Sequence, residues 1–401
     1  LTGMSGGGNV GSLDCRFATA WQTRHAMRPA LALALSIALL IATVSADAQT
    51  APSRPTRVFV SGHSLTDLPM PTYLERIASS LGTPLDWNRQ YMVGSAIKHR
   101  ARGRGNETGW AGYAQGDNKT GSGMDVVREL RTNPYDVLLI TEQHGVIDSL
   151  LSHDAVRHLR HYHDRFIDGN ARGRTFFYEP WLGIPGRTEL RRWIDYERAS
   201  APLWLCIVTR VNRSLEAEGR SDRVTSLPVG LALAELMEQA SRGAVEGLSG
   251  ATPDDTVGRI FHDNVHLTPL GAYYVSLATY AGVFERSPVG AWVPEGVSAV
   301  QAAALQRIAG SATDRLRAER KPLSPEACSA LLRGPFVGTY LAHFRDDYWA
   351  QQQGNALRLT WRRWKGEIRT RWTLWRQDPL AWDMTDRGYW LHPNKSVMDW
   401  R

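Results

Sequence analysis

Cysteine is scarce in this chain of 401 residues, and its main part has little excess of either charge. Three cysteines without a C-x-x-C pair exclude a disulfide-rich scaffold and a thiol site for zinc or redox chemistry. At most one bridge can form, and the sequence does not decide whether Cys206 and Cys328 pair. The formal net charge is +7, but residues 340–401 carry 11 Lys and Arg against 7 Asp and Glu. The remainder is nearly neutral, so we expect no nucleic-acid partner.

Long apolar runs are also scarce, and the one clear run lies near the N-terminus. It covers residues 30–44, follows Met and Arg at 27–28, and precedes an A-x-A motif at 46–48. It is shorter than the roughly 20 residues that span a bilayer. We therefore interpret residues 1–48 as a signal peptide with an upstream segment, a retained anchor being the alternative. The expected location is secreted or periplasmic, with no stable membrane span after cleavage.

The C-terminal residues 340–401 are rich in tryptophan and arginine. They hold eight of the fifteen tryptophans, and basic residues are interleaved with them. Both residue types suit stacking on sugars or adsorption to a membrane surface. Because neither a helical nor a strand period persists through the segment, we favour a poorly packed or disordered tail. The globular domain is accordingly predicted to cover residues 49–339.

Within that domain, segments typical of strands alternate with segments typical of helices. Overall, 43% hydrophobic and 22% charged residues are typical of a folded globular chain. Strands are predicted for RVFVSG (57–62), LDWNRQYMVG (85–94), the wholly apolar DVLLIT (136–141) and RTFFYEPW (174–181). The alternation predicts an α/β fold, a three-layer α/β/α sandwich with a parallel sheet, with further helices at its edge over residues 297–333. In such sheets the functional site lies beyond the carboxyl ends of the strands.

Two short motifs, about two hundred residues apart, carry candidate catalytic residues. Ser64 stands in GHSL, directly after the first predicted strand, where a tight turn would expose its hydroxyl. Asp263 precedes His266 by three residues, just before a predicted helix. A carboxylate at this spacing can hold the imidazole by Nδ1 and leave the other nitrogen to act as a base on serine. Each motif alone is also typical of an ordinary loop or helix cap.

Taken together, the order and spacing of these motifs resemble the SGNH, or GDSL-type, hydrolase family over residues 55–285. The resemblance implies the SGNH fold with its flavodoxin-like parallel sheet. It further implies Ser64 as nucleophile, His266 as general base and then acid, and Asp263 as the residue that orients the histidine. The oxyanion hole would be formed by the backbone N–H groups of Ser64 and Gly94 and by a side chain after the third strand.

The sequence departs from the family pattern at that third position. Residues 141–145 (TEQHG) stand where the family has a glycine and an asparagine. Gln143 carries the same amide donor on a longer side chain, and we expect it to be the third oxyanion donor. Glu142 would repel the developing negative charge as a carboxylate. His63 replaces the family's usual aspartate before the serine, at a position outside the triad.

Other polar residues are candidates of lower rank. Four histidines lie in residues 153–163, and His158 with His161 could share a helical face and bind a metal. A solvated, histidine-rich helix is the favoured interpretation, because the serine mechanism needs neither a metal nor a cofactor. Glu179 and Trp181 follow a predicted strand at the active edge of the sheet and are candidate substrate-binding residues. A strand-terminating turn with a packed tryptophan is the alternative.

The resemblance predicts an exported serine esterase that hydrolyses a carboxylic ester through an acyl-enzyme intermediate. A small-molecule or carbohydrate ester is the expected substrate, with O-acetyl groups on carbohydrate as one class. An O-acyltransferase would use the same triad, and a non-catalytic glycan-binding relative would keep the same fold. The sequence does not separate these three functions, and it leaves the oligomeric state open.

Overall fold

A computed structural model describes residues 54–105, 109–185, 189–344 and 355–380. The segment interpreted as a signal peptide, residues 1–48, lies outside the described residues, as does part of the predicted tail. None of the helices in the described ranges combines the length and the apolar character that crossing a membrane requires.

The core of the fold is a parallel sheet of five strands in the order β2-β1-β3-β4-β5. The central strand is buried along its whole length, which explains why its sequence is wholly apolar except at its last residue. All five carboxyl ends lie at one edge of the sheet, because every pairing is parallel. The strands are β1 (Thr56–Gly62), β2 (Leu85–Tyr91), β3 (Val137–Thr141), β4 (Arg174–Tyr178) and β5 (Val224–Leu227).

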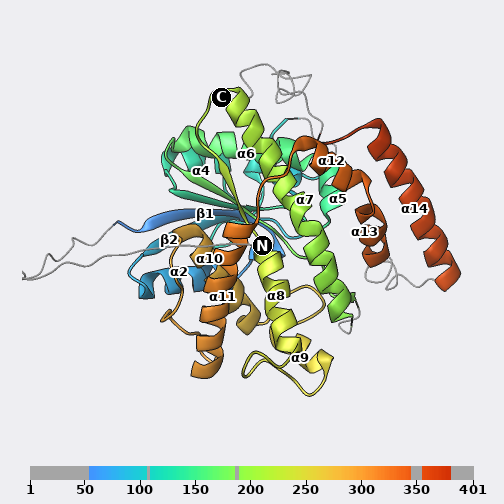
Figure 1. Cartoon of the computed structure of the whole chain (residues 1–401). Coiled ribbons are helices and arrows are strands. Elements are labelled where there is room, and N and C mark those ends of the chain that lie inside the picture. The colour runs from blue at the N-terminus through green and yellow to red at the C-terminus, as the bar shows by residue number, and fades with distance from the viewer. Residues whose placement is uncertain (1–53, 106–108, 186–188, 345–354, 381–401) are drawn as a thin grey trace, which may run out of the picture. The chain divides into compact units, whose positions relative to one another are not determined.

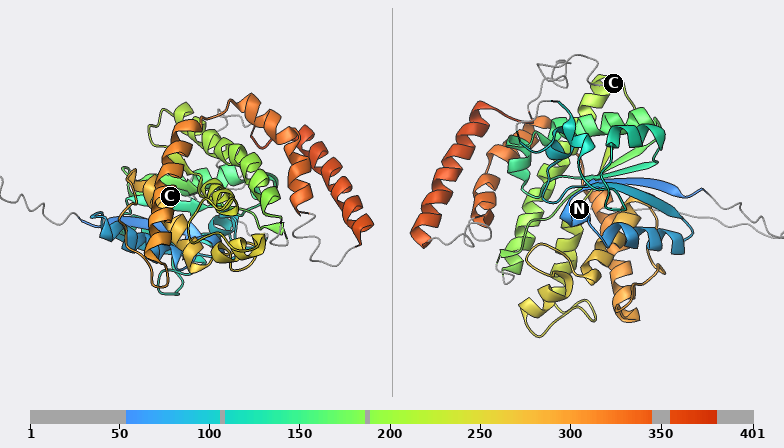
Figure 2. Two further views of the ribbon diagram at one scale, coloured as in Figure 1. Left: turned by 60° about the horizontal axis from the view of Figure 1, so that its bottom comes forward. Right: turned by 180° about the vertical axis from the view of Figure 1, so that it is seen from behind.

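Helices cover both faces of the sheet, so the predicted three-layer α/β/α sandwich is confirmed (Figures 1 and 2). Alternate side chains of β1 enter different cores: Val58 and Val60 pack on one face and Phe59 on the other. The first face is covered by α2 (Met70–Ser80), α8 (Val229–Ser241), α9 (Pro253–Ile260), α10 (Pro269–Phe284) and α11 (Ala299–Glu319). The second is covered by α3 (Ile97–Arg102), α4 (Val126–Thr132), α5 (Val146–Leu151), α6 (Ala155–Gly169) and most of α7 (Leu190–Ala217).

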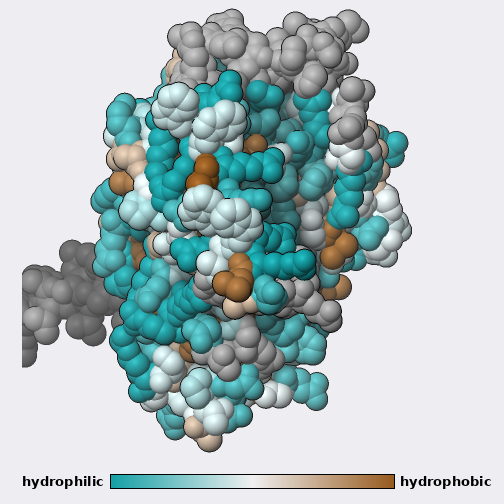
Figure 3. Space-filling model, turned by 90° about the vertical axis from the view of Figure 1, so that its right-hand side faces the viewer, coloured by the Kyte–Doolittle hydropathy of each residue, from teal (hydrophilic) through white to brown (hydrophobic). Residues whose placement is uncertain are grey.

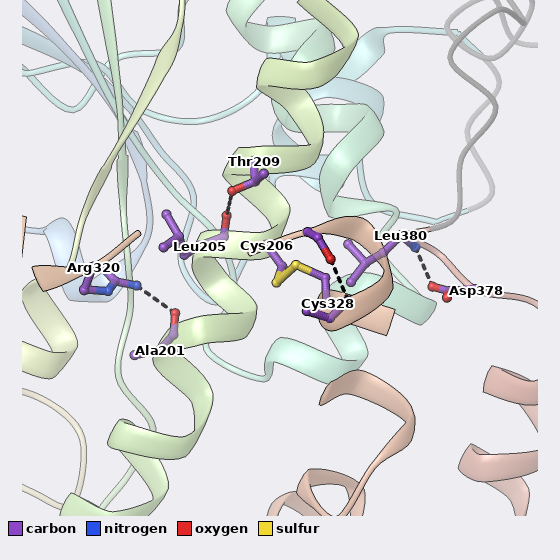
Figure 4. The surroundings of a disulfide bond; sticks show 10 residues. Ala201, Leu205, Cys206, Thr209, Arg320, Cys328, Asp378 and Leu380 are labelled. Atoms are coloured by element: carbon purple, nitrogen blue, oxygen red, sulfur yellow. Dashed lines mark hydrogen bonds between the residues drawn. A yellow bond between two sulfur atoms is a disulfide. The ribbon is translucent and has the colours of Figure 1, made fainter. Parts of the chain in front are cut away.

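A disulfide joins the second helical layer to the C-terminal helices (Figure 4). It links Cys206 in α7 to Cys328 in α12 (Pro325–Arg333), across 122 residues of sequence. Leu380 lies beside the bridge and is almost completely buried. The bridge therefore holds the chain that follows α12 against α7.

The C-terminal region is more ordered than the sequence suggests. Helix α13 (Phe336–Phe344) crosses the predicted domain boundary at residue 340, and the buried Tyr340 donates a hydrogen bond to Asp148 Oδ2 (3.0 Å). A further helix, α14 (Ala356–Arg376), packs beside α13 at the right of Figure 1. The boundary at 340 and the absence of a helical period were therefore wrong for the described part of this region.

Candidate active site

Ser64 lies in a tight turn at the carboxyl end of β1. It begins the short 3-10 helix η1 (Ser64–Thr66), and a Cβ at Gly62 would collide with the Thr66 side chain. His63 caps this turn: its Nε2 donates to the Glu142 carbonyl (2.9 Å), and its Nδ1 accepts from the Leu65 N–H (3.4 Å). Burial, together with the Arg100 guanidinium, lowers the pKa of His63 to about 3. His63 is thus a neutral residue that caps the turn.

Asp263 and His266 are joined within one loop between α9 and α10. Asp263 Oδ2 lies 2.7 Å from His266 Nδ1, while Oδ1 accepts the backbone N–H groups of Val265 and His266, each at 2.7 Å. Because a carboxylate can only accept, Nδ1 carries the proton, and Nε2 of the neutral ring is left with a free electron pair. This is the tautomer that a general base acting on serine requires.

The electrostatics of the pair favour an ionised aspartate. Burial on its own would raise the pKa of Asp263, but the hydrogen bonds from the His266 backbone and imidazole and from Val265 outweigh it. The net effect is a pKa below the ordinary value for aspartate. Asp263 therefore stays charged at neutral pH and can stabilise the imidazolium that forms when His266 takes a proton.

Surrounding residues hold this loop in place. The buried Trp181 donates its indole N–H to the Val265 carbonyl (2.8 Å), and the Ile184 N–H donates to Asn264 (2.7 Å). Thr268 caps α10 by accepting the Gly271 N–H at 3.2 Å. Trp181 thus supports the loop that carries His266, a role that the sequence did not indicate.

The two motifs meet at one pocket. Ser64 and His266 both line a cavity of about 180 Å³ near the carboxyl edge of the sheet. Helix α10 packs against α2, with Ser276 Oγ donating to the Met70 carbonyl (3.1 Å), and this contact brings the start of α10 beside the turn that carries Ser64. The other residues that line the cavity are Leu65, Asp67, Leu68, Pro69, Met70, Trp181, Leu267, Ala272 and Val275.

The two further oxyanion candidates lie in loops beside the serine turn. Gly94 follows β2 with a φ of +58°, in an exposed loop that begins where the Met92 N–H donates to Gly62 (3.1 Å). Gln143 follows β3, and its carbonyl accepts from Ser149 Oγ (2.9 Å). Since β2 and β3 flank β1, both residues share the edge of the sheet with Ser64. Neither is among the residues that line the pocket.

A buried carboxyl group and a buried guanidinium interact electrostatically close to these loops. The Glu142 carboxylate accepts the N–H groups of Gln143 (2.7 Å) and Ile97 (3.2 Å) and interacts with the fully buried guanidinium of Arg100. Burial raises the pKa of Glu142 to about 7, although Arg100 and these hydrogen bonds oppose the shift. Arg100 also donates to Ser95 and to Ser61 Oγ (2.9 Å). The hydrogen bond between the Gln143 N–H and the Glu142 side chain holds the backbone at Gln143 in place.

A third histidine lies close to the catalytic candidates. Burial and the nearby His266 lower the pKa of His144 to about 4, so this ring is neutral at physiological pH. Its centroid is 6.4 Å from that of His63. No sequence pattern indicates that His63, His144 and His266 lie close enough to influence one another.

The two proposed substrate-binding residues have different surroundings. Trp181 lines the pocket, as described above. Glu179 does not: it is buried, and its Oε1 accepts hydrogen bonds from Arg320 (2.9 Å) and from Ser226. The prediction for Glu179 was wrong. Arg320, the residue directly after α11, forms an ion pair with this carboxylate in the protein interior.

The histidine-rich segment is packed rather than solvated. His158, His161 and His163 are buried in α6, and His161 stacks on Trp110 with ring centroids 3.5 Å apart. His163 lies between Thr175 Oγ1 (2.8 Å) and Asp222 (2.6 Å). The expectation of a solvated helix was wrong, since α6 is covered by α3, α4 and α7. Within the described ranges, no three His, Cys, Asp or Glu side chains are grouped so as to hold a metal ion.

Comparisons with known proteins add little to this geometry. No protein-family model matches the chain, and no curated protein matches it either. Among solved structures, the crystal structure of a DUF4886 family protein from Bacteroides uniformis is similar, with 15% sequence identity and a TM-score of 0.46. The alignment covers 67% of this chain and 98% of that chain. A likeness of this degree says nothing about activity.

Proposed function

We propose that this protein is a serine esterase of the SGNH type, acting on a carboxylic ester through an acyl-enzyme intermediate. Ser64 Oγ attacks the carbonyl carbon while His266 Nε2 accepts the hydroxyl proton. The tetrahedral intermediate collapses as His266 protonates the departing alcohol. His266 then activates a water molecule, which attacks the acyl group and releases Ser64.

One observation carries the proposal: a serine and an Asp-paired histidine, two hundred residues apart, line the same pocket. Serine needs a base because its hydroxyl is a weak nucleophile, and the 2.7 Å contact with Asp263 sets the tautomer of that base.

The oxyanion would be stabilised from the carboxyl edge of the sheet. We assign the backbone N–H groups of Ser64 and Gly94 and the side-chain amide of Gln143 to this role. Hydrogen bonds from the Gln143 N–H to Glu142 and from Ser149 Oγ to the Gln143 carbonyl hold the backbone of this residue in place. A preset donor of this kind contributes about 3 kcal/mol to the stability of the transition state.

The pocket favours a small acyl group. The cavity has a volume of about 180 Å³, and polar as well as apolar atoms form its surface. An acetyl group fits within this volume. Acetyl esters, including O-acetyl groups on carbohydrate, are therefore the substrates we propose.

A chain-length series tests this function. We expect the purified protein to hydrolyse p-nitrophenyl esters with kcat/KM falling from acetyl to octanoyl, and Ser64→Ala to reduce the rate by at least about 10³-fold. Ser79→Ala, at an exposed position on α2, is the matched control and should keep full activity. Addition of a sugar acceptor shows whether the acyl group passes to water or to a hydroxyl. Hydrolysis that survives Ser64→Ala would reject the proposed nucleophile.

A further inference from the structure

Helix α14 carries an exposed apolar stripe along its length. Its members recur at steps of three and four residues, the spacing of one helical face. They are Leu357, Trp361, Trp364, Ile368, Trp372 and Trp375, and each is between 49% and 82% exposed. A continuous row of exposed tryptophan on a folded surface indicates an interaction site.

The stripe faces outward because α14 is anchored by a different face. Leu374 is fully buried, and Arg333 Nε donates to its carbonyl (3.0 Å). Arg371 donates to the carbonyls of Arg333 and Gly334, each at 3.2 Å, and also pairs with Glu367. These contacts attach α14 to α12 and α13, and the residues of the stripe remain exposed.

Basic residues border the stripe. The helix has seven Lys and Arg residues and one acidic residue, Glu367, which is already paired with Arg371. At 100° per residue, exposed basic side chains fall along one edge of the stripe: Arg358, Lys365, Arg369 and Arg376. Lys365 Nζ lies 5.1 Å from the ring centroid of Trp361, and the guanidinium of Arg376 lies 4.8 Å from that of Trp372. Figure 3 looks onto this side of the molecule and shows pale and brown side chains set among strongly hydrophilic ones.

We propose that α14 docks on the anionic headgroup surface of a lipid bilayer, lying parallel to the membrane plane. Tryptophan prefers the interface between headgroups and acyl chains, and the flanking Lys and Arg would contact the phosphates. Their aliphatic stems can pack along the stripe while the charges reach the headgroups. The helix does not cross the bilayer in this arrangement.

Charge decides between this partner and the others that an apolar stripe could suit. Pairing α14 with a second copy of itself would bring two basic edges together, and like charges oppose that contact. A neutral glycan would gain nothing from the row of cations. An anionic bilayer satisfies both the aromatic stripe and its basic border.

Vesicle binding by the full chain tests this proposal. We expect binding to phosphatidylcholine vesicles that contain phosphatidylglycerol, and at least about tenfold weaker binding to vesicles of phosphatidylcholine alone. Lys365→Glu with Arg369→Glu should weaken binding to the anionic vesicles at least about tenfold, as should Trp361→Ala with Trp364→Ala. All four side chains are exposed, so the fold should be retained. Arg307→Glu with Lys321→Glu makes the same charge change elsewhere on the surface and should leave binding unaltered.

Several results would overturn the proposal. These are equal binding to neutral and anionic vesicles, or no response to the α14 substitutions. A protein that binds no vesicles but forms a dimer, which Trp361→Ala with Trp364→Ala dissociates, would also overturn it. So would retention of the protein on a neutral polysaccharide, if the same double substitution abolishes that retention. Vesicle binding is measured without any ester substrate. The result of this test is therefore independent of whether the protein is an esterase.

Discussion

At the scale of single residues, polar contacts join positions that are close together in the sequence and positions that are far apart. Asp263 and His266 are three residues apart, so a short loop is enough to bring them together. Arg100 lies in α3 and Glu142 directly follows β3, so no short sequence motif contains both residues. Glu179 was misassigned for the same reason, since its partner Arg320 lies 141 residues away in the sequence. A buried ion pair of this kind becomes visible only in the folded chain.

A buried carboxyl group in α7 makes the stability of the protein dependent on pH. Burial, with a contribution from nearby Glu179, raises the pKa of Glu197 to about 8, although the Leu182 N–H (2.7 Å) opposes the shift. The folded state therefore holds a proton that the unfolded chain releases near pH 4.5. The stabilising contribution is complete below that pH and is lost as the pH rises through about 8.

Glu197→Gln should remove this dependence, because an amide cannot ionise and keeps an oxygen for the Leu182 N–H. We expect the free energy of unfolding of the variant, relative to the wild type, to rise on the order of a few kcal/mol between about pH 4.5 and pH 8 and to be constant outside that window. Urea unfolding at a series of pH values measures the difference. A difference that does not change with pH would show that the carboxyl is not protonated in the folded protein.

At the scale of helices and strands, apolar patterning was informative where an element is buried. Strands β1, β3 and β4 follow from their apolar residues, whereas β2 was predicted only as an extended stretch with several polar residues. The alternation of strands with helices predicts the parallel sheet. Strand β5 was missed because its four residues include the polar Thr225 and Ser226 at the sheet's edge. Helix α14 was missed because its apolar stripe is narrow and arginines are interleaved with it.

The disulfide between α7 and α12 is expected to stabilise the C-terminal helices. Closing a loop of this length typically contributes about 2–4 kcal/mol, since it restricts the unfolded chain. Cys206→Ala with Cys328→Ala should lower the free energy of unfolding by that amount, and a reducing agent should destabilise the wild type similarly but not the variant. Denaturant unfolding with and without reductant is the measurement. Equal midpoints for the oxidised wild type and the variant would mean that the bridge does not form.

At the scale of the whole molecule, two distinct regions carry the two proposals. The pocket with Ser64 and His266 lies near the carboxyl edge of the sheet, and the tryptophan stripe lies on a helix added after the sandwich is complete. The sequence located the first through a resemblance to a family. The tryptophan stripe could be identified only from the structure. The contacts that anchor one face of α14 show which of its side chains stay exposed.

The central claim is that Ser64 is a nucleophile activated by His266 and Asp263. Its most direct test is reaction with a fluorophosphonate followed by mass spectrometry of the peptides. We predict a single adduct on Ser64, no labelling of Ser64→Ala, and labelling of Asp263→Asn slowed by about 10³- to 10⁴-fold, because the asparagine favours the wrong imidazole tautomer. An unlabelled wild type, or an adduct that forms at the same rate in Ser64→Ala, would contradict the account.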